Sequence, residues 1–378
     1  MPSLQHQITD PEKATHTPKA PHHIHIPRWH HTLHPSLTKQ AARNALPTGI
    51  AHIFHPTHAV FTVAQDGAEQ RWFSRWHRKR LYKRPPNQIG SFWARIANMR
   101  RLEYWNVSWW VAISFTLGSI VWVINGFAAF LPFTDSSFTK APNSQGWTAF
   151  LGATIFEIGS IFGIWEAWNR DDATHFGWNA KRALFTHKLE KGGGKEGLSE
   201  SESGSRSPVS MPVSDAEEED ESAPEHRWIW FSTNGKFFRE LGFLGAFSQL
   251  VAASIFWISG FTAIPNIQEK LMDNQGLNDG IYWTPQVIGG TGFMISGTFI
   301  MLEAQKIWWK PNITSLGWHV GFWNFIGAVG FTLSGAFGYA ATASSGAEFE
   351  SALSTFWGGW AFLIGSIVQW YECVNSVS

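Results

Sequence analysis

The sequence predicts an all-α membrane protein whose six transmembrane helices form three repeated helical hairpins. Three observations lead to this fold class. Only 15% of the 378 residues are charged, against about 25% in typical soluble proteins. Six apolar stretches follow residue 107, and each is about 20 residues long, which suffices to cross a hydrocarbon core of about 30 Å. A pattern of glycine, phenylalanine and glutamate recurs in every second stretch.

Two polar segments precede the first apolar stretch. Residues 1–70 are rich in His and Pro and lack apolar periodicity, so we expect them to be disordered. Their histidines could ligate zinc, copper or nickel, but without a framework of other ligands such a site would be loose, and we predict no metal or cofactor. Residues 71–107 form a basic and aromatic juxtamembrane segment. Its part 71–101 sets the topology and offers a surface to anionic lipid headgroups; we expect no nucleic-acid partner.

The hairpins are expected at residues 108–168, 240–305 and 317–373, embedded in a lipid bilayer. A linker of residues 169–239 separates the first two, and the composition of its acidic, Ser-rich part 191–225 predicts disorder. The side that holds the N-terminus carries 27 of the 29 Lys and Arg residues. This asymmetry predicts that both termini are cytoplasmic. The sequence indicates neither which membrane the protein occupies nor its oligomeric state.

The three hairpins align with one another at fixed offsets. In the first helix of each hairpin one large aromatic residue recurs: Trp122, Phe256 and Phe331. In the second helix a glycine recurs: Gly152, Gly289 and Gly358. A phenylalanine follows four residues later: Phe156, Phe293 and Phe362. Each second helix then ends with a glutamate: Glu166, Glu303 and Glu372. Such repeats underlie several transporter folds, and they also arise in proteins that transport nothing.

The three recurring glutamates lie near the predicted cytoplasmic ends of their helices. If the hairpins pack around a pseudo-threefold axis, Glu166, Glu303 and Glu372 could form a ring that attracts cations. The alternative is that each carboxylate reaches headgroup water or pairs with a nearby Lys or Arg, because charges at helix ends are cheap in a membrane. The sequence leaves both interpretations open.

A fourth glutamate, Glu157, stands in the middle of its predicted span. A charged carboxylate at that depth costs roughly 2.5 kcal/mol or more, so it needs a partner, a water-filled cavity or a proton. The candidate partners on other spans are Asn125, Gln249 and Asn324. Glu157 is then either a proton- or cation-sensitive site or a protonated residue that bonds a neighbouring helix.

Small residues are placed where helices would approach closely. Gly159 and Gly163 form a GxxxG motif, and Gly292 with Ser296 forms a similar small pair. Such pairs let helix backbones come into contact. The residues predicted to serve helix packing are Gly152, Gly159, Gly163, Gly289, Gly292, Ser296, Gly358 and Gly365.

Three short stretches of the chain resemble a known group of proteins. Residues 255–261, 289–293 and 316–319 are similar to segments of uncharacterised multi-pass membrane proteins of filamentous fungi. The likeness covers about a quarter of the chain. It implies a polytopic membrane protein and no particular activity.

Two classes of function fit these observations. The repeat and the mid-span Glu157 favour a transporter or channel for a small solute or ion. The alternative is a non-transporting membrane scaffold or regulator that acts through its cytoplasmic regions. Catalytic motifs such as HExxH, GxSxG and Walker A do not occur, so we expect no enzyme.

Overall fold

The computed structural model describes residues 37–63, 67–79, 81, 91–169 and 228–375. Six of its helices are long and apolar enough to cross a membrane, as the sequence predicts for a polytopic membrane protein. These helices are α4 (Val107–Thr134), α5 (Pro142–Trp168), α7 (Leu241–Thr262), α10 (Thr284–Ala304), α11 (Leu316–Gly338) and α12 (Ser345–Val374). They fall in the regions of the predicted hairpins 108–168, 240–305 and 317–373, and α12 begins at Ser345, where the side chain of Ser344 caps it.

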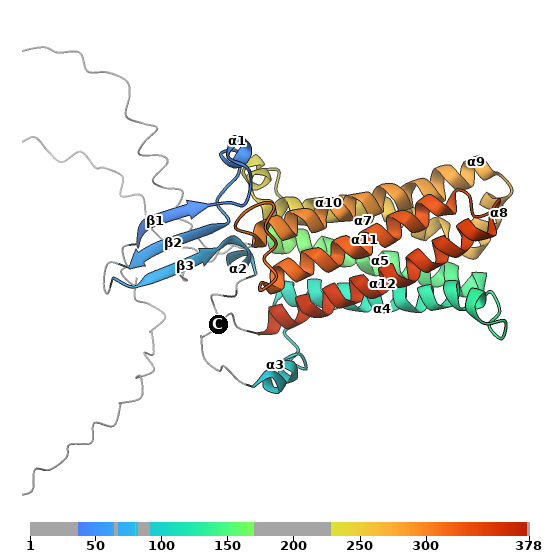
Figure 1. The fold of residues 1–378 in the computed structure, drawn as a ribbon, viewed down its shortest axis with the longest axis horizontal. Helices are drawn as coiled ribbons and strands as arrows, with labels where there is room; N and C mark the ends of the chain where they lie inside the picture. The colour runs from blue at the N-terminus through green and yellow to red at the C-terminus, as the bar shows by residue number, and fades with distance from the viewer. Residues whose placement is uncertain (1–36, 64–66, 80, 82–90, 170–227, 376–378) are drawn as a thin grey trace, which may run out of the picture. The chain divides into compact units, whose positions relative to one another are not determined.

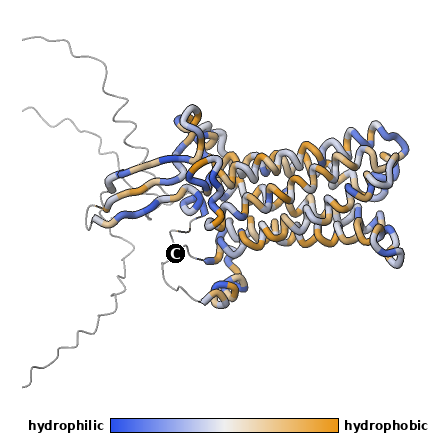
Figure 2. The backbone as a smooth tube through the Cα atoms, viewed as in Figure 1, coloured by the Kyte–Doolittle hydropathy of each residue, from blue (hydrophilic) through white to orange (hydrophobic). Residues whose placement is uncertain are grey.

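The six helices run side by side along the bundle (Figure 1), and their contacts form a closed ring in chain order. Each helix packs against its sequence neighbours, and α12 closes the ring against α4. We call the end that holds Trp168, Ala304 and Val374 the sheet end, and the other the hairpin end. Apolar residues run along the helices, and polar residues gather at the sheet and the helix ends (Figure 2).

Short elements join the helices. At the hairpin end, α7 and α10 are joined by α8 (Pro265–Met272), α9 (Gln275–Asn278) and the π-helical turn η3 (Asp279–Trp283). At the sheet end, η2 (Gly235–Arg239) leads into α7, and α3 (Phe92–Asn98) precedes α4. The predicted disordered part of the linker, 191–225, lies outside the described residues.

Two layers of three aromatic rings fill the centre of the bundle. The first layer is built by Trp122, Phe256 and Phe331, whose ring centroids lie 4.7 to 5.5 Å apart. The second is built by Phe156, Phe293 and Phe362, at 5.4 to 6.3 Å. The residues that the sequence aligns therefore meet at the centre, although a duplication of the hairpins stays a prediction.

Glycines make room for these rings. A Cβ atom on Gly152 would lie 2.7 Å from the Trp122 ring, and one on Gly289 would lie 2.6 Å from Cβ of Phe256. A Cβ atom on Gly358 would lie 3.0 Å from the Phe331 ring. Such spacing is closer than side chains tolerate, so a larger residue here would displace the rings.

The other small residues predicted to serve packing behave differently. A Cβ on Gly159 would meet α4 at 3.2 Å, one on Gly292 would meet α7 at 2.7 Å, and one on Gly365 would meet Asn324 at 2.9 Å. The buried Ser296 hydroxyl donates to the Gly245 carbonyl at 2.8 Å. Gly163 contradicts the prediction, since nothing lies within 4 Å of a Cβ built there. It lines a small internal cavity instead of a helix contact.

The expectation of disorder over residues 1–70 is wrong for the part that the structure describes. An antiparallel sheet is formed by β1 (Leu37–Arg43), β2 (His58–Val63) and β3 (Glu69–Phe73), with α1 (Thr48–Ala51) between β1 and β2. The signal for it is the alternation in β2, where Ala59, Phe61 and Val63 are buried on one face. This alternation is difficult to recognise in the sequence, because the strand is short and histidines flank it. Residues 1–36 lie outside the described residues.

The buried His58 should make the sheet sensitive to acid. Burial, and then the charges of Arg43 and Lys306, lower its pKa from 6.5 to about 4, while Glu303 opposes this. Between pH 6.5 and about 4, His58 is therefore protonated in the unfolded chain but neutral in the folded protein. The free energy of unfolding falls as the pH is lowered through this range. We expect a loss of about 2–3 kcal/mol over that window. Comparing the melting temperatures of the wild type and His58→Gln between pH 7.5 and 4.5 checks this, and parallel curves would contradict it.

Candidate functional site: a cavity, an aromatic core and a buried ion-pair network

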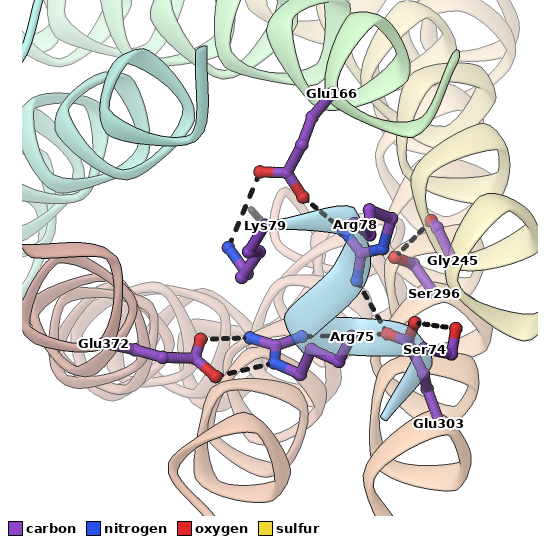
Figure 3. Close-up of polar contacts among 9 residues, drawn as sticks. All are labelled: Ser74, Arg75, Arg78, Lys79, Glu166, Gly245, Ser296, Glu303 and Glu372. Carbon is purple, nitrogen blue, oxygen red and sulfur yellow. Dashed lines mark hydrogen bonds and ion pairs between the residues drawn. The ribbon is translucent and has the colours of Figure 1, made fainter. Parts of the chain in front are cut away.

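Three basic side chains of the N-terminal region enter the sheet end of the bundle. Strand β3 continues without a loop into the short helix α2 (Ser74–Arg78), which carries Arg75 and Arg78. Lys79 follows directly. All three basic side chains are buried, at 2 to 8% relative exposure. Figure 3 shows them surrounded by Glu166, Glu303 and Glu372, each from a different membrane helix.

Arg75 makes a bidentate contact with Glu372. Its Nε donates to Glu372 Oε1 at 2.8 Å, and its Nη2 donates to Oε2 at 2.6 Å. Its Nη1 also lies 3.9 Å from Glu303 Oε2. This bidentate geometry is the strongest arrangement available to an arginine and a carboxylate.

Arg78 links the other two glutamates. Its Nη2 donates to Glu303 Oε2 at 2.6 Å, and its Nη1 donates to Glu166 Oε1. Lys79 Nζ lies 3.6 Å from the other oxygen of Glu166. The Ser74 hydroxyl completes the network by donating to Glu303 Oε1 at 3.0 Å.

The network is electrically balanced, with three cations facing three carboxylates. Burial alone would lower the pKa of Arg75, but the charge of Glu372 and its hydrogen bonds outweigh burial and raise that pKa above its ordinary value. The same holds for Arg78 beside Glu303 and Glu166. Both arginines therefore stay charged. Burying charged groups costs free energy, and the pairing of each cation with a carboxylate offsets that cost.

Of the two interpretations that the sequence left open for the glutamates, the structure shows the one in which each carboxylate pairs with a nearby Lys or Arg. The expectations of an open cation-binding ring and of a basic segment at the lipid surface are corrected. Glu166, Glu303 and Glu372 do lie together, but the ring is filled by Arg75, Arg78 and Lys79 and offers no open carboxylates to a cation. The same three basic residues belong to the segment 71–101, which the sequence places at the lipid surface. They are withdrawn from that surface because each has a buried carboxylate to neutralise it.

A cavity of about 480 Å³ enters the bundle from the hairpin end. Its floor is the Trp122 ring of the first aromatic layer. Its wall carries amide and hydroxyl groups among aromatic rings. The polar side chains include Asn125, Gln145, Ser259, Gln268, Asn278, Gln286, Ser334, Ser351 and Thr355. The two charged ones among the described residues are Lys140 and Glu348, which pair with each other at 2.6 Å.

A much smaller cavity, of about 40 Å³, lies between the aromatic core and the ion-pair network. Arg75, Arg78 and Glu166 form one side of it, and the amides of Gln249, Asn324 and Gln369 form another. That volume holds roughly one to three water molecules. The two cavities are separated by the aromatic layers, and Phe115, which lines the small cavity, packs against Phe156 of the second layer.

The four residues expected to form one intramembrane polar site are not brought together. Asn125 donates to the Gln145 carbonyl and to Thr148 at the large cavity. Gln249 and Asn324 line the small one. Glu157 lines neither: its Oε1 accepts a hydrogen bond from Ser254 of the adjacent α7 at 2.9 Å. Its position on the helix, one residue after the inward-facing Phe156, turns it away from the bundle centre.

Replacing Glu157 by glutamine should therefore be nearly silent. The amide oxygen keeps the bond from Ser254, and no described cation depends on the charge. We expect Glu157→Gln to change the free energy of unfolding by less than about 0.5 kcal/mol. Glu157→Leu should cost about 1 kcal/mol, because the Ser254 hydroxyl then loses its partner on α5 and bonds only within its own helix. Thermal unfolding in detergent measures both, and a large loss with glutamine would restore an ionised role for Glu157.

Comparison with protein-family models, with curated proteins and with solved structures finds no match. The resemblance to fungal membrane proteins accordingly stays a prediction from the sequence. The site must be interpreted from its own geometry.

Sequence reasoning missed the basic partners of the glutamates and most of the cavity wall. A signal for the first was present, because three glutamates buried at helix ends require about three cations. Arg75 and Arg78 lie on one short helix, and Lys79 follows it directly. The cavity residues carried no comparable signal. Gln286, Ser334 and Thr355 look like ordinary polar residues of membrane helices until their neighbours are known.

Proposed function

We propose that this protein is a transporter for a small, uncharged polar solute. The observation that supports the proposal is the cavity of about 480 Å³, which runs from the hairpin end to Trp122. Its size falls within the usual range of small-molecule sites, about 300–1,000 Å³.

The lining of the cavity indicates the class of solute. Amides such as Asn125 and Gln286 and hydroxyls such as Ser334 can exchange hydrogen bonds with hydroxyl groups of a ligand. Trp122 and Trp283 offer apolar faces beside them. The Lys140–Glu348 pair neutralises itself and favours neither an anion nor a cation. A polyol or another uncharged hydrogen-bonding solute fits this combination.

Two barriers close the path beyond the cavity. The six aromatic rings block the bundle centre, and the ion-pair network fills the sheet end. In transporters, opposite ends of a central site open in turn as helices rock against one another. Here the structure corresponds to a state open at the hairpin end, and release requires α2 and its basic side chains to withdraw.

Uptake by reconstituted protein tests the proposal. Liposomes with purified protein should accumulate radiolabelled glycerol, erythritol or sorbitol faster than protein-free liposomes. Ala129→Trp, which adds a ring to the cavity wall, should reduce that uptake about tenfold by excluding the solute from its site. Ile124→Trp introduces the same side chain on the exposed face of α4, away from the cavity, and should leave uptake unchanged.

A scaffold is the second candidate, and a specific observation favours it. The bundle centre is filled by aromatic rings set against glycines, so no continuous path crosses the described residues. A scaffold predicts no uptake of any of the three solutes and no difference between Ala129→Trp and Ile124→Trp. That result would remove the transporter proposal.

A further inference from the structure

One face of the N-terminal sheet carries basic side chains toward the end of the bundle. Two rows of directly paired residues cross the three strands β1, β2 and β3. One row is Arg43, His58 and Phe73, and the other is Ala41, Val60 and Arg71. Paired residues in antiparallel strands point to the same face. Together with Lys306 from the α10–α11 connection, this face surrounds a pocket of about 380 Å³.

The pocket is strongly positive. Its cations come from three separate elements: Arg43 from β1, Arg71 from β3 and Lys306 from the connection. Among the described residues, no Asp or Glu lines it, and no carboxylate forms an ion pair with Arg43 or Lys306. The buried His58 at its base responds to both of these charges, which lower its pKa after burial does. Because the imidazole is neutral, the cations considered for a ligand are Arg43 and Lys306.

The pocket lies at the level where lipid headgroups are found. Lys306 comes two residues after the end of α10 at Ala304. Gln305 holds the connection in place by donating to the carbonyls of Ile307, Trp308 and Lys310. Trp308 and Trp309, which follow, are more than half exposed. Exposed tryptophans at the end of a membrane helix mark the interface between hydrocarbon and headgroups.

We propose that this pocket binds a phosphate group, held by Arg43 and Lys306. A phosphate presents several charged oxygens, and converging arginine and lysine side chains are the groups that proteins use to hold it. Two sources share this chemistry: an anionic lipid in the adjoining leaflet and a soluble phosphate ester. A bound phosphate would bridge the sheet to the α10–α11 connection, and so would fix β3 and the α2 helix that follows it.

Binding to the full-length protein in detergent tests the site. The lipid arm titrates dioleoyl phosphatidic acid against phosphatidylcholine and counts bound lipids by native mass spectrometry. The soluble arm titrates inositol 1,4-bisphosphate and inorganic phosphate by calorimetry. The test variant is Arg43→Gln/Lys306→Gln. The control is Lys39→Gln/Lys310→Gln, which removes the same charge from exposed residues of the same strand and connection that do not line the pocket.

We expect the test variant to weaken phosphate binding about 30-fold, since each basic residue near an anionic headgroup contributes about fivefold. The control should change it less than about threefold, because exposed charges away from the ligand are screened. If the test variant loses binding only in the lipid arm, the ligand is a lipid. If it loses binding in both arms, the ligand is a soluble phosphate. The single variant Lys306→Gln repeats the test if the double variant does not fold. Equal weakening by the test and control variants, or none by either, overturns the proposal.

Discussion

Replacing Arg78 by alanine should lower the free energy of unfolding by about 3–5 kcal/mol, because it leaves three buried carboxylates facing only two cations. Arg78 is the only described residue that bonds both Glu166 and Glu303. Lys79 remains near Glu166, and Arg75 lies 3.9 Å from Glu303, too far for a hydrogen bond. The measurement is chemical or thermal unfolding of the purified protein in detergent, followed by tryptophan fluorescence.

Two comparisons separate this effect from a general loss of charge. Arg100→Ala removes an exposed arginine and should change stability by no more than about 0.5 kcal/mol. The double variant Arg75→Met/Glu372→Met removes one whole ion pair, and should cost less than either single change, because no buried charge is left alone. If Arg78→Ala were as mild as Arg100→Ala, the network would not be buried as described.

Replacing Phe256 by alanine should cost about 3–5 kcal/mol by opening a void in the aromatic core. Its ring contacts Trp122, Phe331 and Phe293, with centroids 5.5, 5.5 and 5.8 Å away. In a membrane the hydrophobic effect does not drive helices together, so lost packing contacts account for the cost. The same void should extend the large cavity only as far as the second layer of Phe156, Phe293 and Phe362, so the leak of glycerol through reconstituted protein should stay unchanged.

Phe261→Ala is the matched control for this change. Phe261 lies on the same helix, but 41% of it is exposed, and its replacement should cost less than about 1 kcal/mol. Unfolding in detergent and glycerol leak from liposomes are measured on both variants. Equal losses from Phe256→Ala and Phe261→Ala would mean that the aromatic layers do not form the core.

The sequence predicted the parts of this fold that depend on local pattern. Apolar length located all six helices, and the repeated offsets aligned the residues that meet in the two aromatic layers, such as Phe156 and Phe293. The same offsets placed Glu303 and its two counterparts at one end of the bundle, where basic side chains bridge them. Each of these conclusions uses residues of a single helix or a fixed spacing between helices.

Pairings between distant segments could not be predicted in this way. Arg75 and Glu372 are separated by 297 positions, and no local pattern connects them. The sequence therefore places the basic segment at the lipid surface, where an unpaired cation would belong. It places Glu157 in the middle of its span because depth can be estimated from sequence, whereas the direction of one residue around a helix depends on its neighbours, here Ser254 of α7.

The ion-pair network also bears on the order in which the protein is made. Its basic residues precede the first membrane helix, and its last carboxylate, Glu372, lies near the end of the sixth. A ribosome therefore delivers the cations long before the chain contains all of their partners. Until α12 has been inserted, Arg75 lacks its bidentate carboxylate. A nascent or truncated chain would thus expose unneutralised charge at the bundle end, a feature by which quality-control proteases could distinguish it from a finished one.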